Sequence, residues 1–353
     1  MDINRTEKSV LTDKYGKGAY FAMCNVSLLL VMTTFLSNIF SFEIYTLLDK
    51  FSISLQRMVM NVLLVFGAQR QDAYAAAKYV VGSEAFSEVL SIVTSFICLV
   101  IPAIVFSKFV KLDKGETFNV SGKCINNLIP IFCLCHLITT FASVFSGMIS
   151  DFMLPTSADI YNAYTGVSAH TFNLYEFIIN ILCTCIFVPV VEEYVFRGVV
   201  FGYLKRYGVN FAIVASAVVF GIAHASPVQS VYAFVFGVVS ALVVAVTGNI
   251  KTSIIFHVGN NFITVVLGYA MGEMSDAGFN AVSSLYLMVV SFFGIYGLYA
   301  LCKKDGILSK IREDNDALEQ EELVVKPGMS KIVVFPLAVY IAYYVYSVIA
   351  TVM

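Results

Sequence analysis

The chain has 353 residues, of which 59% are hydrophobic and only 13% are charged, and its formal net charge is -2. Soluble domains usually carry about 25% charged residues, so the composition argues against a soluble domain, and the weak negative charge argues against a nucleic-acid-binding protein. Repeated apolar stretches of about 20 residues instead indicate a protein that lies in a lipid bilayer and crosses it several times.

The apolar stretches predict an all-α fold, a polytopic membrane helical bundle with about eight to nine transmembrane helices. A polar tail, 1–18, precedes an N-terminal transmembrane region, 19–171, which contains a long outer loop, 48–88. A later transmembrane segment, 273–302, is followed by an acidic segment, 303–331, which fits a cytoplasmic linker. The predicted spans are, in chain order, 19–47, 89–109, 125–149, 177–204, 210–225, 228–246, 253–271, 282–301 and 332–353.

The distribution of basic residues predicts the orientation. Lys and Arg gather in the N-terminal tail and at 205–206, whereas the loops 150–171 and 272–281 contain neither. Because short cytoplasmic loops carry an excess of Lys and Arg, we expect a multi-pass protein of the cell membrane with a cytoplasmic N-terminus. The long loop 48–88 is the exception, because it falls outside although it contains Lys and Arg, which its acidic residues balance. Its apolar part, 58–66, is too short to span and fits a re-entrant or interfacial helix.

Residues 189–198 read Pro-Val-Val-Glu-Glu-Tyr-Val-Phe-Arg-Gly and place three ionisable groups inside a predicted span. Such groups are costly at membrane depth and usually mark a functional site. Glu193 and Arg197 are four residues apart and share a helix face, which predicts a salt bridge. Glu192 is turned by about 100° from Glu193, so we expect it to face a cavity and to act as a general base. Pro189, one turn before the glutamates, lacks an N–H group, which predicts a freed backbone carbonyl there.

Two further polar pairs lie in nearby spans: Phe220 with His224, and His257 with Asn261. Each pair is spaced by four residues, so its two side chains line one helix face. A single buried histidine is more often structural than catalytic, and a lone Glu–Arg pair can be structural too. The two glutamates, the two histidines and Asn261 occur together at compatible depths along three helices, which predicts one shared site that includes Glu192.

The remaining histidines, His136 and His170, have no such partners, which favours structural or loop roles. The eight cysteines lie mostly in apolar segments and favour packing roles over disulfides or metal binding.

These residue types suit the attack of water on a peptide carbonyl. Glu192 would deprotonate the water, His224 would orient it or bind a metal, and the oxyanion would accept hydrogen bonds from His257 and Asn261. The chain has no His-Glu-x-x-His motif, yet Glu192, His224 and His257 are candidate zinc ligands. The residues therefore leave two alternatives, a glutamate-activated water and a zinc-bound water.

At these positions the chain resembles the CPBP family, which contains the CAAX prenyl proteases and bacteriocin-processing (Abi) enzymes. Its motifs Glu-Glu-x-x-x-Arg, Phe-x-x-x-His and His-x-x-x-Asn occur here in order, beginning at Glu192, Phe220 and His257. The resemblance implies an α-helical intramembrane endopeptidase with a catalytic core at 172–272 and a site open toward the cytoplasmic side. Eukaryotic members of the family cleave after a prenylated cysteine.

The resemblance also implies a role for each site residue. Glu192 would be the catalytic carboxylate with His224 as its partner, His257 and Asn261 would form the oxyanion-side pair, and Glu193 with Arg197 would hold the first helix.

The predicted function is therefore an intramembrane endopeptidase. Its substrate would be a membrane-embedded or lipidated peptide, such as a CAAX-like protein or a bacteriocin or pheromone precursor. The alternative is a non-proteolytic immunity or scaffold protein of the same family. A proton-coupled transporter is a third interpretation, but it would predict inverted repeats, and the charged site occurs only once in the chain.

Overall fold

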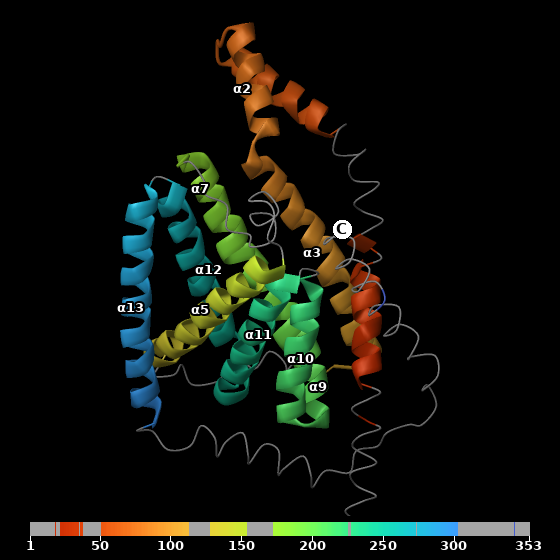
Figure 1. Cartoon of the computed structure of the whole chain (residues 1–353). Coiled ribbons are helices and arrows are strands. Elements are labelled where there is room, and N and C mark those ends of the chain that lie inside the picture. The colour runs from red at the N-terminus through yellow and green to blue at the C-terminus, as the bar shows by residue number, and fades with distance from the viewer. Residues whose placement is uncertain are drawn as a thin grey trace, which may run out of the picture.

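The computed structural model describes residues 22–34, 36–37, 51–112, 128–153, 172–224, 227–272 and 274–302, together with residues 18 and 342. Every regular element within these ranges is a helix (Figure 1), which confirms the prediction of an all-α fold. The N-terminal tail, the linker 303–331 and the last predicted span lie outside the described ranges, apart from those two isolated residues.

Six described helices are long and apolar enough to cross a membrane, as judged by length and composition. Their apolar segments are Ile92–Phe109, Ile129–Met148, Leu174–Tyr207, Gln229–Thr247, Ile250–Ala270 and Ala277–Ala300, and each overlaps one predicted span. The full helices are α3 (Glu84–Phe109), α5 (Leu128–Met153), α11 (Pro227–Thr247), α12 (Ile250–Gly272), α13 (Asp276–Cys302) and the composite helix described below. These helices confirm the polytopic helical bundle.

Three apolar helices are shorter than a full span: Ala22–Thr34, Phe51–Val65 and α10 (Val209–Ala223). The first covers part of the predicted span 19–47, and α10 corresponds to the predicted span 210–225. Phe51–Val65 contains most of the apolar part of the loop 48–88, and α2 (Arg70–Gly82) follows it. Figure 1 shows α2 beyond the end of α3, away from α10–α13. The interfacial location of Phe51–Val65 stays a prediction.

The glutamate-bearing helix is irregular over its whole length. It consists of α7 (Leu174–Asn180), π-helical η1 (Ile181–Phe187), α8 (Val188–Glu193), π-helical η2 (Tyr194–Phe201), α9 (Gly202–Leu204) and the 3₁₀ turn η3 (Lys205–Tyr207). Asn173 caps its start by accepting from the backbone N–H of Tyr175 and of Glu176. Wide π turns are frequent at functional sites, and here they flank the segment that carries Glu192 and Glu193.

Helices α10 and α11 pack closely on each other because small residues line their contact. A Cβ atom added at Gly237 would lie 2.9 Å from Cα of Ala217, and one added at Gly221 would lie 2.9 Å from the backbone oxygen of Ser230. Small residues allow close helix approach in membranes. Gly221 lies three residues before His224, so this close contact positions the end of α10 that His224 caps.

We expect Gly237→Ala to lower the free energy of unfolding by about 1–3 kcal/mol, since backbone atoms of α10 must move to admit the methyl group. Thermal unfolding in detergent measures the effect. Gly147→Ala on α5 is the matched control, because no atom lies within 4 Å of the added Cβ, and it should be neutral or stabilising. Equal stability of the two variants would contradict the close contact of α10 and α11.

Candidate active site

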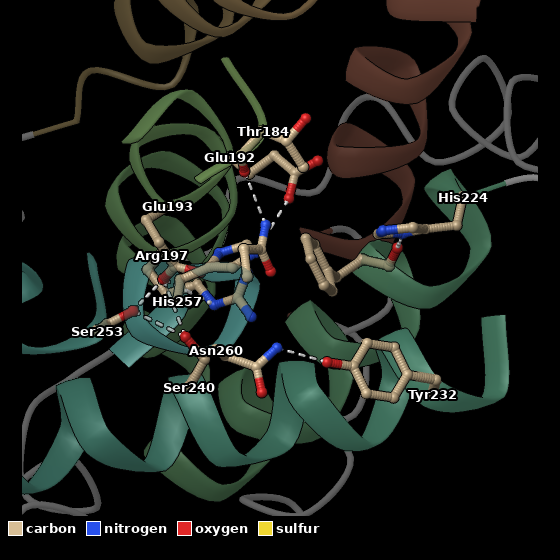
Figure 2. A network of polar contacts seen from close by, with 12 residues as sticks. Thr184, Glu192, Glu193, Arg197, His224, Tyr232, Ser240, Ser253, His257 and Asn260 are labelled. Carbon is tan, nitrogen blue, oxygen red and sulfur yellow. Dashed lines mark hydrogen bonds and ion pairs between the residues drawn. The ribbon is translucent and has the colours of Figure 1, made fainter. Parts of the chain in front are cut away.

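The Glu193 carboxylate is the centre of a buried polar cluster (Figure 2). Its side chain is fully buried, and its Oε2 atom lies 3.3 Å from Nε of Arg197, which confirms the predicted salt bridge. Ser240 Oγ donates to the same oxygen at 2.9 Å, and Ser253 Oγ donates to it as well. The other oxygen, Oε1, lies 3.0 Å from Nδ1 of His257. Residues of η2, α11 and α12 therefore converge on one carboxylate.

His257 lies between the two adjacent glutamates. An ionised carboxylate only accepts hydrogen bonds, so Nδ1 of His257 is the donor to Glu193. The opposite ring nitrogen, Nε2, lies 3.7 Å from Oε2 of Glu192. The hydrogen bond at one nitrogen sets which nitrogen is free for chemistry. Glu193 thus orients the ring so that Nε2 faces Glu192.

The two glutamates have different surroundings, as the helical spacing predicts. The Glu193 side chain is 0% exposed, whereas the Glu192 side chain is 19% exposed. Glu193 is the carboxylate paired with Arg197, while the ion-pair partner of Glu192 among the described residues is His257. Glu192 is therefore the carboxylate that small molecules can reach.

Arg197 is buried with little hydrogen bonding. Its guanidinium lies 4.3 Å from the ring centre of Phe220 and 6.0 Å from that of Phe236. Within the described residues, none of its three side-chain nitrogens has a hydrogen-bond partner. Its charge is balanced by Glu193 and by the faces of the two aromatic rings, so Arg197 depends on the charge of Glu193.

His224 lies across from the glutamates at the end of α10. Its Nδ1 atom lies 2.8 Å from the carbonyl oxygen of Phe220, and since a carbonyl only accepts, Nε2 is left as the acceptor nitrogen. The Phe220 ring is 4.7 Å from the His224 ring and 6.3 Å from the His257 ring. Figure 2 shows the His224 ring directed toward the middle of the site. No ion pair or hydrogen bond joins His224 to Glu192 within the described ranges.

Asn261 bonds the carbonyl that Pro189 leaves free. In a π-helical turn, a backbone N–H donates to the carbonyl five residues earlier, and the residue five positions before Pro189 is Thr184. Proline has no N–H to donate, and Asn261 Nδ2 donates to the Thr184 oxygen at 3.0 Å instead. This bond agrees with the prediction that Pro189 interrupts the backbone hydrogen bonds of this helix. Because the amide carries two N–H groups, one remains for a substrate.

Ser240 and Ser253 were not predicted from the sequence. Ser253 lies four residues before His257 on the same helix face, and this spacing could have indicated it. Ser240 lies among apolar residues of α11, and no motif or spacing in the sequence indicates a role for it.

The three candidate zinc ligands do not form a zinc site in this arrangement. Among the described residues, no group of three His, Cys, Asp or Glu side chains is placed to hold a metal ion. His257 directs Nε2 toward Glu192, whereas His224 lies across the site from both of them. A catalytic zinc site needs three converging protein ligands, so these residues do not fit the zinc alternative.

Residues 174–263 match the family described as type II CAAX prenyl endopeptidase Rce1-like. This segment belongs to the CAAX protease family. It runs from α7 into α12 and contains all six predicted site residues, while α3, α5 and α13 lie outside it. No significant match was found among curated proteins or among solved structures. At the family level, the segment is that of a CAAX-type intramembrane protease, and the six long apolar helices, three of which lie within the segment or overlap it, agree with a multi-pass membrane protein.

Proposed function

We propose that the chain is an intramembrane endopeptidase that hydrolyses a peptide bond in a membrane-embedded or lipidated peptide. The observation that supports this most is the arrangement around His257, which Glu193 orients toward the accessible Glu192. Residues 172–272 would be the catalytic core of this enzyme. The charge distribution supports a location in the cell membrane with a cytoplasmic N-terminus.

The chemistry follows from the donors and acceptors of the site. A water bound between Glu192 and Nε2 of His224 would donate one hydrogen to each, because both are acceptors. Glu192 takes one proton as the water oxygen attacks the carbonyl carbon, which forms the new C–O bond. The second N–H of Asn261 donates to the carbonyl oxygen as negative charge develops on it. Collapse of the intermediate breaks the C–N bond, and Glu192 returns the proton to the leaving amine.

His257 would position Glu192 in this mechanism. Its Nδ1–H group stays bonded to the Glu193 carboxylate, and its Nε2 atom lies 3.7 Å from Oε2 of Glu192. We therefore propose that His257 holds Glu192 in place, instead of acting as the oxyanion donor expected from the sequence.

The substrate class can be tested with one peptide in two forms. A peptide that ends in a CAAX sequence is prepared with a farnesylated cysteine and with a free cysteine, and is incubated with the full-length protein in liposomes. The prenyl chain concentrates the peptide at the bilayer, so we expect the farnesylated form to have a kcat/KM at least about tenfold higher. A hydrophobic bacteriocin precursor tests the other substrate class. Binding of all three peptides without cleavage would support the non-proteolytic alternative.

Metal chelation is expected to leave the activity unchanged, because the described residues form no three-ligand zinc site. The purified protein is dialysed against a strong chelator, its zinc content is measured, and peptide cleavage is then assayed. A loss of activity that returns on addition of zinc would contradict the metal-free mechanism.

A further inference from the structure

A second polar cluster lies beside the site and includes helices outside the matched segment. His136 on α5 is buried; its Nδ1 atom lies 3.2 Å from Oδ1 of Asn260 on α12, and its Nε2 atom lies 2.7 Å from the hydroxyl of Tyr286 on α13. Uncharged polar groups inside a membrane bundle usually bond between helices. We call His136, Asn260 and Tyr286 the α12 clamp.

Asn260 has three side-chain partners on two neighbouring helices, α5 and α11. Besides His136, its Oδ1 atom accepts from Thr139 Oγ1 at 3.2 Å, and its Nδ2 atom donates to the Tyr232 hydroxyl of α11 at 2.7 Å (Figure 2). The side chain is almost fully buried. Such a bonded amide holds α12 in one rotation and one height, because any shift would leave buried polar atoms without partners.

Apolar contacts fix the same part of α12. A Cβ atom added at Gly259 would lie 2.7 Å from the Phe132 ring of α5. That ring stacks on His136, with 5.7 Å between ring centres. A Cβ atom added at Gly297 would clash with the Pro130 oxygen, so α13 also approaches α5 closely. Together these contacts make α5 and α13 a continuous support for α12.

The clamp lies next to the residues that face the substrate. Asn260 follows His257 by three residues, less than one helical turn, and directly precedes Asn261. A slide of α12 by one residue would be accompanied by a rotation of about 100°, which would remove His257 from Glu193 and Asn261 from Thr184. Small errors in position are costly for catalysis, about 100-fold for a displacement of about 1 Å.

We propose that His136, Asn260 and Tyr286 are positioning residues that hold α12 so that His257 stays between Glu193 and Glu192. The catalytic unit then extends beyond the matched segment to α5 and α13. This inference rests on the proposed peptidase function. It also changes the role expected for His136, from an isolated structural histidine to a residue that acts on the site through Asn260.

The test compares Tyr286→Phe and Asn260→Ala in the full-length protein, with kcat, KM and the thermal midpoint measured for each. Tyr286→Phe removes one hydroxyl and should lower kcat about fivefold to tenfold, and Asn260→Ala should lower it about 100-fold, both with KM unchanged. Asn260→Asp keeps an acceptor for His136 and Thr139 and should restore most of kcat. Tyr296→Phe is the matched control, because Tyr296 lies on the same helix and is exposed.

The outcomes separate this inference from the proposed function. If Glu192→Gln is inactive while Tyr286→Phe and Asn260→Ala keep the wild-type kcat, the positioning role is wrong and the peptidase stands. A lower thermal midpoint with unchanged kcat would show a purely structural role and would also overturn it. If Asn260→Ala does not fold, Tyr286→Phe decides. If Glu192→Gln is fully active, the proposed peptidase itself is wrong.

Discussion

Glu192→Gln is expected to lower kcat by about 100- to 10,000-fold, the usual contribution of a general base. The amide has nearly the same shape as the carboxylate but cannot accept the proton of the attacking water. Because Glu192 is partly exposed and is not the carboxylate paired with Arg197, the free energy of unfolding should change by less than about 1 kcal/mol. Initial rates of peptide cleavage and thermal unfolding in the same detergent measure the two effects.

Glu176→Gln is the matched control for this variant. Glu176 belongs to the first turn of the same composite helix, far along the chain from the site residues, so the charge change is identical while the base is retained. We expect its kcat to stay within about twofold of the wild-type value. A Glu192→Gln variant with wild-type kcat would rule out Glu192 as the base.

Glu193→Gln should destabilise the protein by about 3–5 kcal/mol, the cost of leaving a buried charge without its partner. Arg197 has no hydrogen-bond partner for its side-chain nitrogens among the described residues, so loss of the carboxylate removes its ion-pair partner and leaves its charge beside aromatic rings and the partly exposed Glu192. The amide keeps one accepting oxygen in place of two, so His257 competes for it with Ser240 and Ser253 and is oriented less firmly. Thermal unfolding should show a clearly lower midpoint than for Glu192→Gln, and cleavage should be lost as well.

A double variant separates charge balance from catalysis. Glu193→Gln combined with Arg197→Met removes both charges, and apolar replacements of buried ion pairs are often neutral or stabilising. We therefore expect the double variant to regain much of the lost stability without regaining activity. If Glu193→Gln alone is as stable as the wild type, the salt bridge does not hold this part of the fold.

Local features of the fold followed directly from the sequence. The length of the apolar stretches predicted the six long helices, and the four-residue spacing predicted the Glu193–Arg197 salt bridge. Both features depend only on the geometry of a single helix. Pro189 predicted a free carbonyl for the same reason. The composite helix extends further than its predicted span, from Leu174 to Tyr207, since polar residues at helix ends lower hydropathy without ending the helix.

Contacts between helices could not be predicted in this way. The spacing placed Glu192 and Glu193 on different faces, yet both reach His257 because an imidazole presents two nitrogens on opposite sides of the ring. Asn260 and Asn261 are neighbours in the sequence. Asn260 is the one that bonds α5 and α11, and this depends on how those helices pack against α12. Ser240 reaches Glu193 across the bundle, and a lone serine in an apolar helix does not indicate such a partner.

The most direct test of peptidase activity is the mass of the products formed from a farnesylated peptide by the full-length protein in liposomes. Hydrolysis of one peptide bond predicts two fragments whose masses add up to that of the peptide plus one water molecule. We expect these fragments with the wild-type protein, also in the presence of chelator, but not with Glu192→Gln. An intact peptide that binds the wild-type protein but yields no fragments would contradict the peptidase and would support a non-proteolytic binding role.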